Sequence, residues 1–359
     1  MARYIEFDQQ NDVVSNTTKV TSGFFSDGKG TLAGTNLTTA SLAASQKNYY
    51  YNVQYNSTDH FSVTAGNMGG SGSDSDKSTN VKGETEAIYK QYSSAFLKRE
   101  EVATGFTMVD GTNGTSVVSQ SSIYVINSER LRMKDRLNRK NWTLTLSGSD
   151  LGGDSKEIIL TDDSNNLSAV ASPMGPRYNI VSGSSGTVAV DAATRTYGHY
   201  FPNVGTMVFS ANALSHSLGG DPDYIAADPK AVESGAHLTA TGSGLAYDHS
   251  VATTADNAYK LFVSLYKGSI TLRAEEDQVT TDYFCRARAT EFNYSMNPSF
   301  TSGTDNKIRH SSMIGNPQTF ITEVGLYNAT NELLAIGKLS SPVQKNYGTE
   351  ATVKVKLTY

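Results

Sequence analysis

The sequence predicts a mainly β fold of antiparallel sandwich or barrel-like domains, with one principal helix and a C-terminal three-stranded unit. Three observations predict it. Short apolar runs are separated by turn signals about every ten residues, which is typical of antiparallel strands. Only 18% of the residues are charged, and Gly, Ser, Thr and Asn are abundant, which favours turns and strands. The last nine residues alternate strictly between two kinds of side chain.

The alternation at the C-terminus predicts a half-buried strand. Because strand side chains point to opposite faces in turn, the residues of 351–359 separate into two sets. Val353, Val355, Leu357 and Tyr359 share one face, and lysines occupy the other. Burying each of these large apolar side chains would stabilise the fold by about 1.5–3 kcal/mol. We therefore expect 319–359 to form three docked strands that end the chain.

The principal helix is predicted over residues 84–101. Ile88, Tyr92, Ala95 and Phe96 recur at helical spacing and would form one apolar stripe. Acidic residues come early in this segment and basic residues come late, an order that complements the helix dipole.

The remaining apolar runs are predicted as strands in three regions. Residues 1–110 form an N-terminal β-rich region with long polar loops and the helix, and 111–256 form a central β domain. Residues 257–359 form a C-terminal β assembly domain. It opens with a predicted strand pair, 259–266 and 269–274, joined by a Lys-Gly turn.

Composition limits the classes of function. The net charge of −5 argues neither for nor against a nucleic acid partner. The single cysteine, Cys285, precludes an intrachain disulfide, and we expect it to be a small buried hydrophobe on a strand. No secretory signal and no apolar run long enough to span a membrane is visible, so we expect a chain made in the cytoplasm with no membrane partner.

Several segments resemble a family of known proteins. VGLYNATNELLAIGKL, from Val324 to Leu339, is similar to a module of tail proteins in tailed bacteriophages. YFCRARATEFNYSMNPSF, at 283–300, and the series YVIN, NWTLTLSG, LTDDS, RYNIVSG and YGHYFPNVGTMVFS, within 122–214, resemble virion structural proteins of contractile-tailed marine bacteriophages.

The resemblance implies a structural subunit of a phage particle, most plausibly of the tail or baseplate. Such a subunit is made in the host cytoplasm, resides in the virion, binds copies of itself and other virion proteins, and is not an enzyme. A head decoration or neck protein, or a receptor adhesin that grips glycans with exposed tyrosines, are the alternatives. A glycan-degrading enzyme is the least favoured class.

A basic segment at 130–140 is the sharpest local charge signal. Arg130, Arg132 and Arg136 lie in it together with other cations and few acidic residues. Three interpretations stay open: contact with nucleic acid phosphates, an intersubunit surface of ion pairs, or a solvated hairpin or short helix. Nucleic acid is the least favoured, because no aromatic stacking platform accompanies the cations beyond Trp142.

A second candidate interface lies between residue 283 and the C-terminus. Alternation places Arg286 and Arg288 on one strand face, where the pair could grip a carboxylate of a neighbour; the alternative is that their stems cover apolar area. The remaining candidate interface residues come from the segments that carry the resemblance. They are Tyr294, Leu326, Tyr327 and Tyr359.

No motif indicates a cofactor, a metal or a small-molecule substrate. The pairs Asp74 with Asp76 and Asp221 with Asp223 could hold calcium, but Asp in Gly- and Ser-rich loops is more often a turn former. Asp248-His249 could be half of a catalytic dyad, but no nucleophile elbow accompanies it. We therefore expect no catalytic, cofactor or metal site.

Overall fold

The computed structural model describes residues 4–39, 49–73, 83–110, 116–149, 155–190, 195–216, 247, 257–302 and 304–359. The chain divides into two compact units. The central unit comprises residues 20–276, and the terminal unit combines residues 1–19 with 277–359. The two ends of the chain thus share one unit, whereas the sequence was divided into three consecutive regions.

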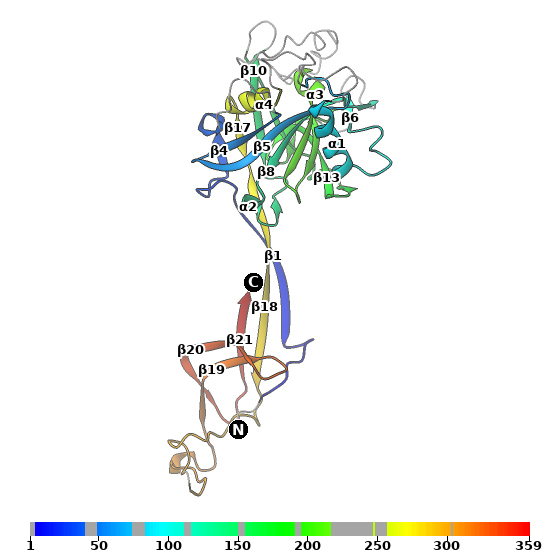
Figure 1. Cartoon of the computed structure of the whole chain (residues 1–359). Helices are drawn as coiled ribbons and strands as arrows, with labels where there is room; N and C mark the ends of the chain where they lie inside the picture. The colour runs from blue at the N-terminus through cyan, green and yellow to red at the C-terminus, as the bar shows by residue number, and fades with distance from the viewer. Residues whose placement is uncertain are drawn as a thin grey trace. The chain divides into compact units, whose positions relative to one another are not determined.

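The central unit is built on a large antiparallel sheet that curls into a half-barrel (Figure 1). In the part of the chain that the structure describes it has 13 strands, and predicted regions 1–110 and 111–256 both contribute to it. The mainly β, antiparallel prediction is confirmed. Its main path runs in the order β2 (Thr31–Ala33), β17 (Ser269–Thr271), β10 (Thr143–Ser149), β11 (Ser155–Asp162), β13 (Gly175–Ser184), β15 (Gly198–Phe201), β16 (Thr206–Ser210), β8 (Ser122–Ser128), β5 (Thr58–Asn67), β4 (Tyr50–Tyr55) and β3 (Thr38–Thr39).

Smaller elements complete the central unit. Strands β12 (Val170–Ser172) and β14 (Thr187–Val188) pair with β13, and β6 (Thr107–Asp110) pairs with β7 (Ser116–Ser119). The short helical elements are η1 (Gly34–Asn36), α2 (Arg130–Met133) and α3 (Ala211–His216).

Both faces of the sheet pack against hydrophobic side chains, as the residues of strand β8 show. Tyr124 and Ile126 belong to the larger hydrophobic cluster, whereas Ile123 and Val125 belong to a second cluster. Because neighbouring residues of a strand point to opposite faces, the two clusters lie on the two faces of the sheet. This arrangement explains a strand in which four consecutive apolar side chains are all buried.

Helix α4 (Asn257–Tyr266) packs against β4, β5 and β10 on the face of the larger cluster. The predicted strand 259–266 is therefore wrong. Ala258, Leu261, Phe262 and Leu265, which are all buried, follow helical spacing along one side. A short, nearly continuous apolar run does not distinguish a strand from a buried helix.

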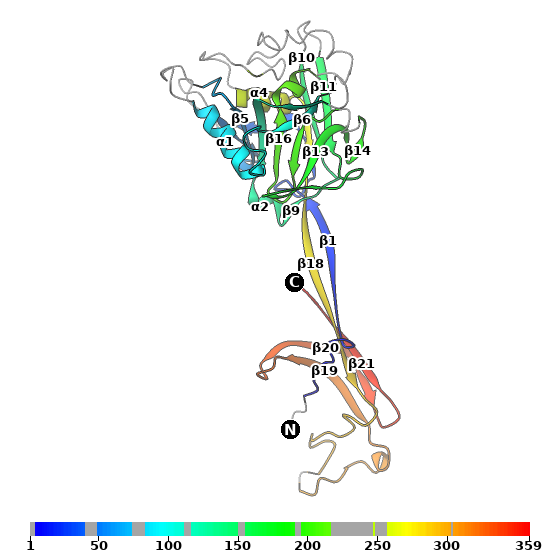
Figure 2. The same cartoon turned by 90° about the vertical axis from the view of Figure 1, so that its right-hand side faces the viewer.

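Helix α1 (Glu84–Phe96) covers the opposite face and packs mainly on β5 (Figure 2). Its position is confirmed, but it ends at Phe96, before the predicted residue 101, because Leu97 adopts an extended backbone. Tyr89 lies at the centre of its buried face. Gly66 of β5 permits the close approach, since a Cβ there would lie 2.9 Å from the backbone nitrogen of Tyr89.

The terminal unit contains two small sheets. In the first, the order is β1 (Val13–Gly23), β18 (Arg273–Ala287) and β21 (Ala351–Thr358). The second is a hairpin of β19 (Thr319–Tyr327) and β20 (Leu333–Lys345). The three C-terminal strands are thus present, but the last pairs with β18 instead of the hairpin. The turn η3 (Ser311–Met313) precedes the hairpin.

The predicted faces of the last strand are confirmed by its register with β18. Val353 lies opposite Cys285 and Val355 lies opposite Tyr283, so these side chains share a face and are half-buried. Tyr359 differs from the expectation, because it is 69% exposed. Its hydroxyl lies 2.7 Å from the hydroxyl of Thr281, and its backbone exchanges two hydrogen bonds with Val279. Cys285, expected to be buried, is only partly buried.

A hydroxyl deletion tests the packing of α1. The Tyr89 hydroxyl is buried, donates to the carbonyl of Gln120 at 2.7 Å and accepts from the amide of Phe106 at 3.1 Å. Tyr89→Phe leaves both backbone groups without this partner, so we expect unfolding free energy to fall by about 1–3 kcal/mol in urea titrations. The control Tyr50→Phe, at a residue 63% exposed, should change it by less than about 0.5 kcal/mol. Equal losses in both variants would contradict the assignment.

Candidate functional site

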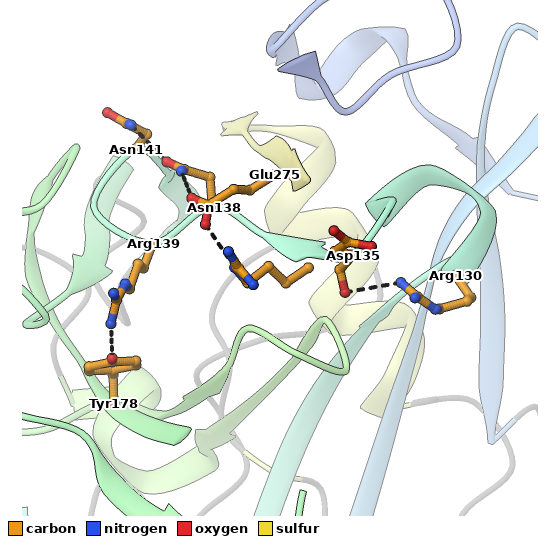
Figure 3. Close-up of polar contacts among 8 residues, drawn as sticks. Arg130, Asp135, Asn138, Arg139, Asn141, Tyr178 and Glu275 are labelled. Atoms are coloured by element: carbon orange, nitrogen blue, oxygen red, sulfur yellow. Dashed lines mark hydrogen bonds and ion pairs between the residues drawn. The ribbon is translucent and has the colours of Figure 1, made fainter. Parts of the chain in front are cut away.

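The basic segment 130–140 folds as a short helix followed by a short strand of the central unit. Helix α2 ends where Lys134 adopts a positive φ of 57°. Strand β9 (Arg136–Leu137) then pairs with the first residues of β18, with Arg136 opposite Glu275. Arg136 and Glu275, 139 residues apart in the sequence, thus meet. Figure 3 shows Glu275 beside Asn138 of the basic segment.

Carboxylates of the same chain neutralise part of this segment. Arg136 Nε lies 2.7 Å from Glu275 Oε1, and both side chains are largely buried, at 24% and 6% exposed. Asn138 donates a second hydrogen bond to the Glu275 carboxylate. Lys134 Nζ lies 2.8 Å from Glu276 Oε1. We call these five residues the Glu275 cluster; it joins β9 to β18 and leaves Arg136 largely unavailable to a partner.

The other arginines of the segment also contact their own chain. Arg130 donates to the backbone carbonyls of Lys134 and Asp135, and Arg139 donates to the Tyr178 hydroxyl (Figure 3). Arg132 is partly buried, and its Nε has no hydrogen-bond partner among the described residues. The contacts favour the interpretation of a locally folded surface over a row of cations free for phosphates.

The terminal unit buries little apolar surface. Among its described residues the buried apolar side chains are Ala287, Phe300, Leu326 and Ala351. Neither hydrophobic cluster includes a residue of this unit. A compact unit ordinarily has a hydrophobic core of its own. This one is held together mostly by strand pairing and polar contacts.

Ion pairs fasten the strands of the terminal unit to each other. Arg286 Nε lies 2.7 Å from Asp12 Oδ1, and Lys354 Nζ lies 2.6 Å from Asp282 Oδ2. Lys354 also lies over the ring of Phe284, with its Nζ 5.7 Å from the ring centre. Arg286 is therefore already engaged within the chain. Arg288, predicted on the same strand face, is exposed just after β18 ends.

A buried lysine fixes the loop that follows β18. Lys345, at the end of β20, is fully buried and donates to the carbonyls of Ala289 and Asn346 and to Asn293 Oδ1, at 3.1, 2.8 and 2.8 Å. Beyond this loop the predicted interface residue Tyr294 is 50% exposed and packs edge-on against Phe300.

The hairpin β19–β20 has the most unusual surface of the terminal unit. We define its outer face as the face that carries the exposed side chains Glu323, Tyr327, Leu333, Leu334, Ile336 and Lys338. Leu326, proposed as an interface residue, lies on the other face and is buried, so it is not available to a partner. Tyr327 is 42% exposed, and its ring meets that of Tyr4 at 4.9 Å.

Sequence reasoning missed the large apolar residues of this outer face. Leu334 is 68% exposed and Ile336 is 53% exposed. A signal was present, because in LLAIGKL the large residues alternate with Ala335 and Gly337, but the alternation alone does not say which set faces the unit.

The described residues contain no group of three or more His, Cys, Asp and Glu side chains that could hold a metal ion. A groove of about 530 Å³ beside α1 is lined by residues such as Met68, Lys90 and Val102, without a carboxylate. The pairs Asp74 with Asp76 and Asp221 with Asp223, and Asp248-His249, lie outside the described residues. No helix in the described part is long and apolar enough to cross a membrane.

Comparison with known proteins gives no relative. No family model matches the sequence, and neither the curated proteins nor the solved structures include a match to it.

Removing the central carboxylate tests the Glu275 cluster. Glu275→Gln leaves Arg136 largely buried without its charge partner, so we expect a loss of about 1–3 kcal/mol of unfolding free energy in urea. Asp305→Asn is the matched control, because the pair of Asp305 with Lys307 is exposed and such pairs contribute about 0–1 kcal/mol. A Glu275→Gln variant as stable as this control would show that the cluster does not hold β9 to β18.

A buried histidine predicts acid sensitivity. His199 of β15 lies within hydrogen-bond distance of the Thr107 carbonyl through Nε2. Its burial, aided by the charge of Arg177, lowers its pKa from 6.5 to about 3. Below pH 6.5 the unfolded chain therefore binds a proton at His199 that the folded chain does not bind. As a result, the contribution of His199 to stability is fully present above pH 6.5 and is lost as the pH falls toward 3.

We expect His199→Gln to flatten the decline of unfolding free energy between pH 6.5 and 4 by as much as about 1.4 kcal/mol per pH unit. The exposed counterpart His310→Gln should keep the wild-type slope. Thermal or urea unfolding across this pH range provides the measurement, and equal slopes for all three proteins would refute the prediction.

Proposed function

We propose that this protein is a structural subunit of a phage particle, of the tail or baseplate, which acts by binding copies of itself and other virion proteins through its terminal unit. The observation that carries the proposal is the distribution of apolar side chains. The central unit contains both hydrophobic clusters, whereas the terminal unit buries Phe300 and Leu326 but leaves most of its large apolar side chains exposed.

Exposed apolar surface on this scale supports a docking role. Single exposed apolar residues are common on any protein, but several in one hairpin are typical of a surface that another protein covers. The exposed large apolar residues of the terminal unit extend beyond the hairpin. They include Met296, Ile314, Phe320 and Tyr347.

Open strand edges support the same role. In the described residues, β1 and β21 are the outer strands of their sheet, and β19 and β20 pair only with each other. An outer strand presents backbone donors and acceptors that a strand of another chain can satisfy. Lys354 and Lys356, on β21, discourage indiscriminate pairing at one of these edges.

The resemblance of segments within 122–214, 283–300 and 324–339 to virion structural proteins supplies the biological setting. In this setting the protein acts without catalysis, and it binds neither a cofactor nor a small-molecule substrate. Its binding free energy comes from apolar area that the isolated chain leaves in water.

The proposal is tested on particles purified from the phage whose genome encodes this chain. We expect quantitative mass spectrometry to find the chain at a fixed ratio to the other tail proteins, and cross-links to other chains to concentrate in 277–359. Hydrogen exchange in β19 and β20 should be slower in particles than in the isolated chain. Absence of the chain from purified particles would overturn the proposal.

A further inference from the structure

Strand β20 has an inverted amphipathic pattern over four residues. Leu334 and Ile336 are exposed, whereas Ala335 and Gly337, which alternate with them, are partly buried. A strand that covers only its own unit has the opposite pattern, with large apolar residues inside and small or polar residues outside. In this part of β20 the larger apolar side chains therefore lie on the outer face.

The inner face of β20 lies beside β21. A Cβ on Gly337 would lie 3.7 Å from a methyl group of Val355, which is an ordinary van der Waals contact. The inner face thus packs against the terminal unit. On the outer face Tyr327 meets the ring of Tyr4 at 4.9 Å, but Leu333, Leu334 and Ile336 remain 47%, 68% and 53% exposed.

The outer face also carries one charge of each sign at matched positions. Glu323 of β19 lies directly opposite Lys338 of β20 in the register of the hairpin. A two-fold axis parallel to the strands, placed between two stacked hairpins, puts β19 of one copy over β20 of the other. Glu323 of each copy then faces Lys338 of the other, so the face is complementary to itself in charge.

We propose that the outer face of the hairpin packs against the same face of a second copy of this chain about such a two-fold axis. Tyr327, Leu333, Leu334 and Ile336 form the buried centre of this contact, and the two Glu323–Lys338 pairs lie at its rim. This inference rests on the proposed function and names one partner of the terminal unit.

Charge reversal provides a decisive test. Glu323→Lys alone and Lys338→Glu alone each bring two like-charged pairs together across the axis, so we expect the dimerisation of each variant to weaken at least tenfold in sedimentation velocity. An equimolar mixture of the two single variants pairs Lys at position 323 with Glu at 338, and Lys at 338 with Glu at 323. We expect this mixture to recover association to within about threefold of the wild type at low salt.

The mixture also separates contacts between chains from contacts within one. Each single variant has the same charge at positions 323 and 338 of its own hairpin, and mixing does not change this. Recovery on mixing therefore supports contact between copies, whereas weak association in the mixture as well as in each variant overturns the inference.

Removal of an apolar side chain provides the second test. Leu334→Ser should weaken dimerisation at least tenfold, because Leu334 is at the centre of the contact. The control Leu131→Ser removes an exposed leucine, 81% exposed, from α2 of the central unit and should leave dimerisation unchanged. Circular dichroism confirms that both variants keep the wild-type strand content.

The outcomes distinguish this inference from the proposed function. A chain that self-associates with no response to position 323, 334 or 338 overturns the two-fold contact and leaves the assembly role standing. A chain that stays monomeric at 100 μM, on the order of the weakest specific associations, also overturns it, and its presence in particles would then identify another virion protein as the occupant of the face. Absence from particles, by contrast, overturns the proposed function.

Discussion

The confinement of both hydrophobic clusters to residues 20–276 is the constraint on which the rest of the structure depends. Within this unit one sheet supplies both clusters, because strands such as β8 and β16 contribute side chains to its two faces. Helices α4 and α1 then cover opposite faces of this sheet. Neither cluster includes a residue of the terminal unit, so the proposed role of this unit rests on its exposed side chains.

Polar contacts take the place of a core in the terminal unit. Its strands are fastened by two ion pairs whose members are partly exposed, and such pairs stabilise a fold only slightly in water. Lys345 is the exception, since three oxygen atoms surround its buried ammonium group. Weak ion pairs are compatible with the proposed assembly role, because binding of a partner to the folded form alone would stabilise that form.

The features that depend on local periodicity could be predicted from the sequence. The two faces of β21 and the position of α1 follow from spacings of two and of about 3.6 residues, which the sequence displays directly. The identity of α4 could not be predicted, because its apolar run is short and fits either period. The pairing of β21 with β18 depends on a contact between distant segments, for which periodicity carries no information.

The candidate interface residues show the same division between local and distant information. Arg136 was correctly placed in a basic segment, but its partner Glu275 lies 139 residues away and takes up its charge. Leu326 was correctly placed on a strand, but the face it occupies is the inner one. In both cases the residue type suggested a contact, and only the tertiary structure decided that the contact lies within the chain.

The outer face of the hairpin differs from these two cases, because its large apolar side chains remain exposed in the structure of the chain. The small residues of this part of β20, Ala335 and Gly337, lie on the partly buried face, where Gly337 is beside Val355. Large residues on the opposite face then cannot be explained by the fold of the chain itself. Leaving Leu334 and Ile336 in water forfeits roughly 1.5–3 kcal/mol for each side chain relative to full burial. That free energy is recovered only when another surface covers them, so the stability of this hairpin and its association draw on the same side chains.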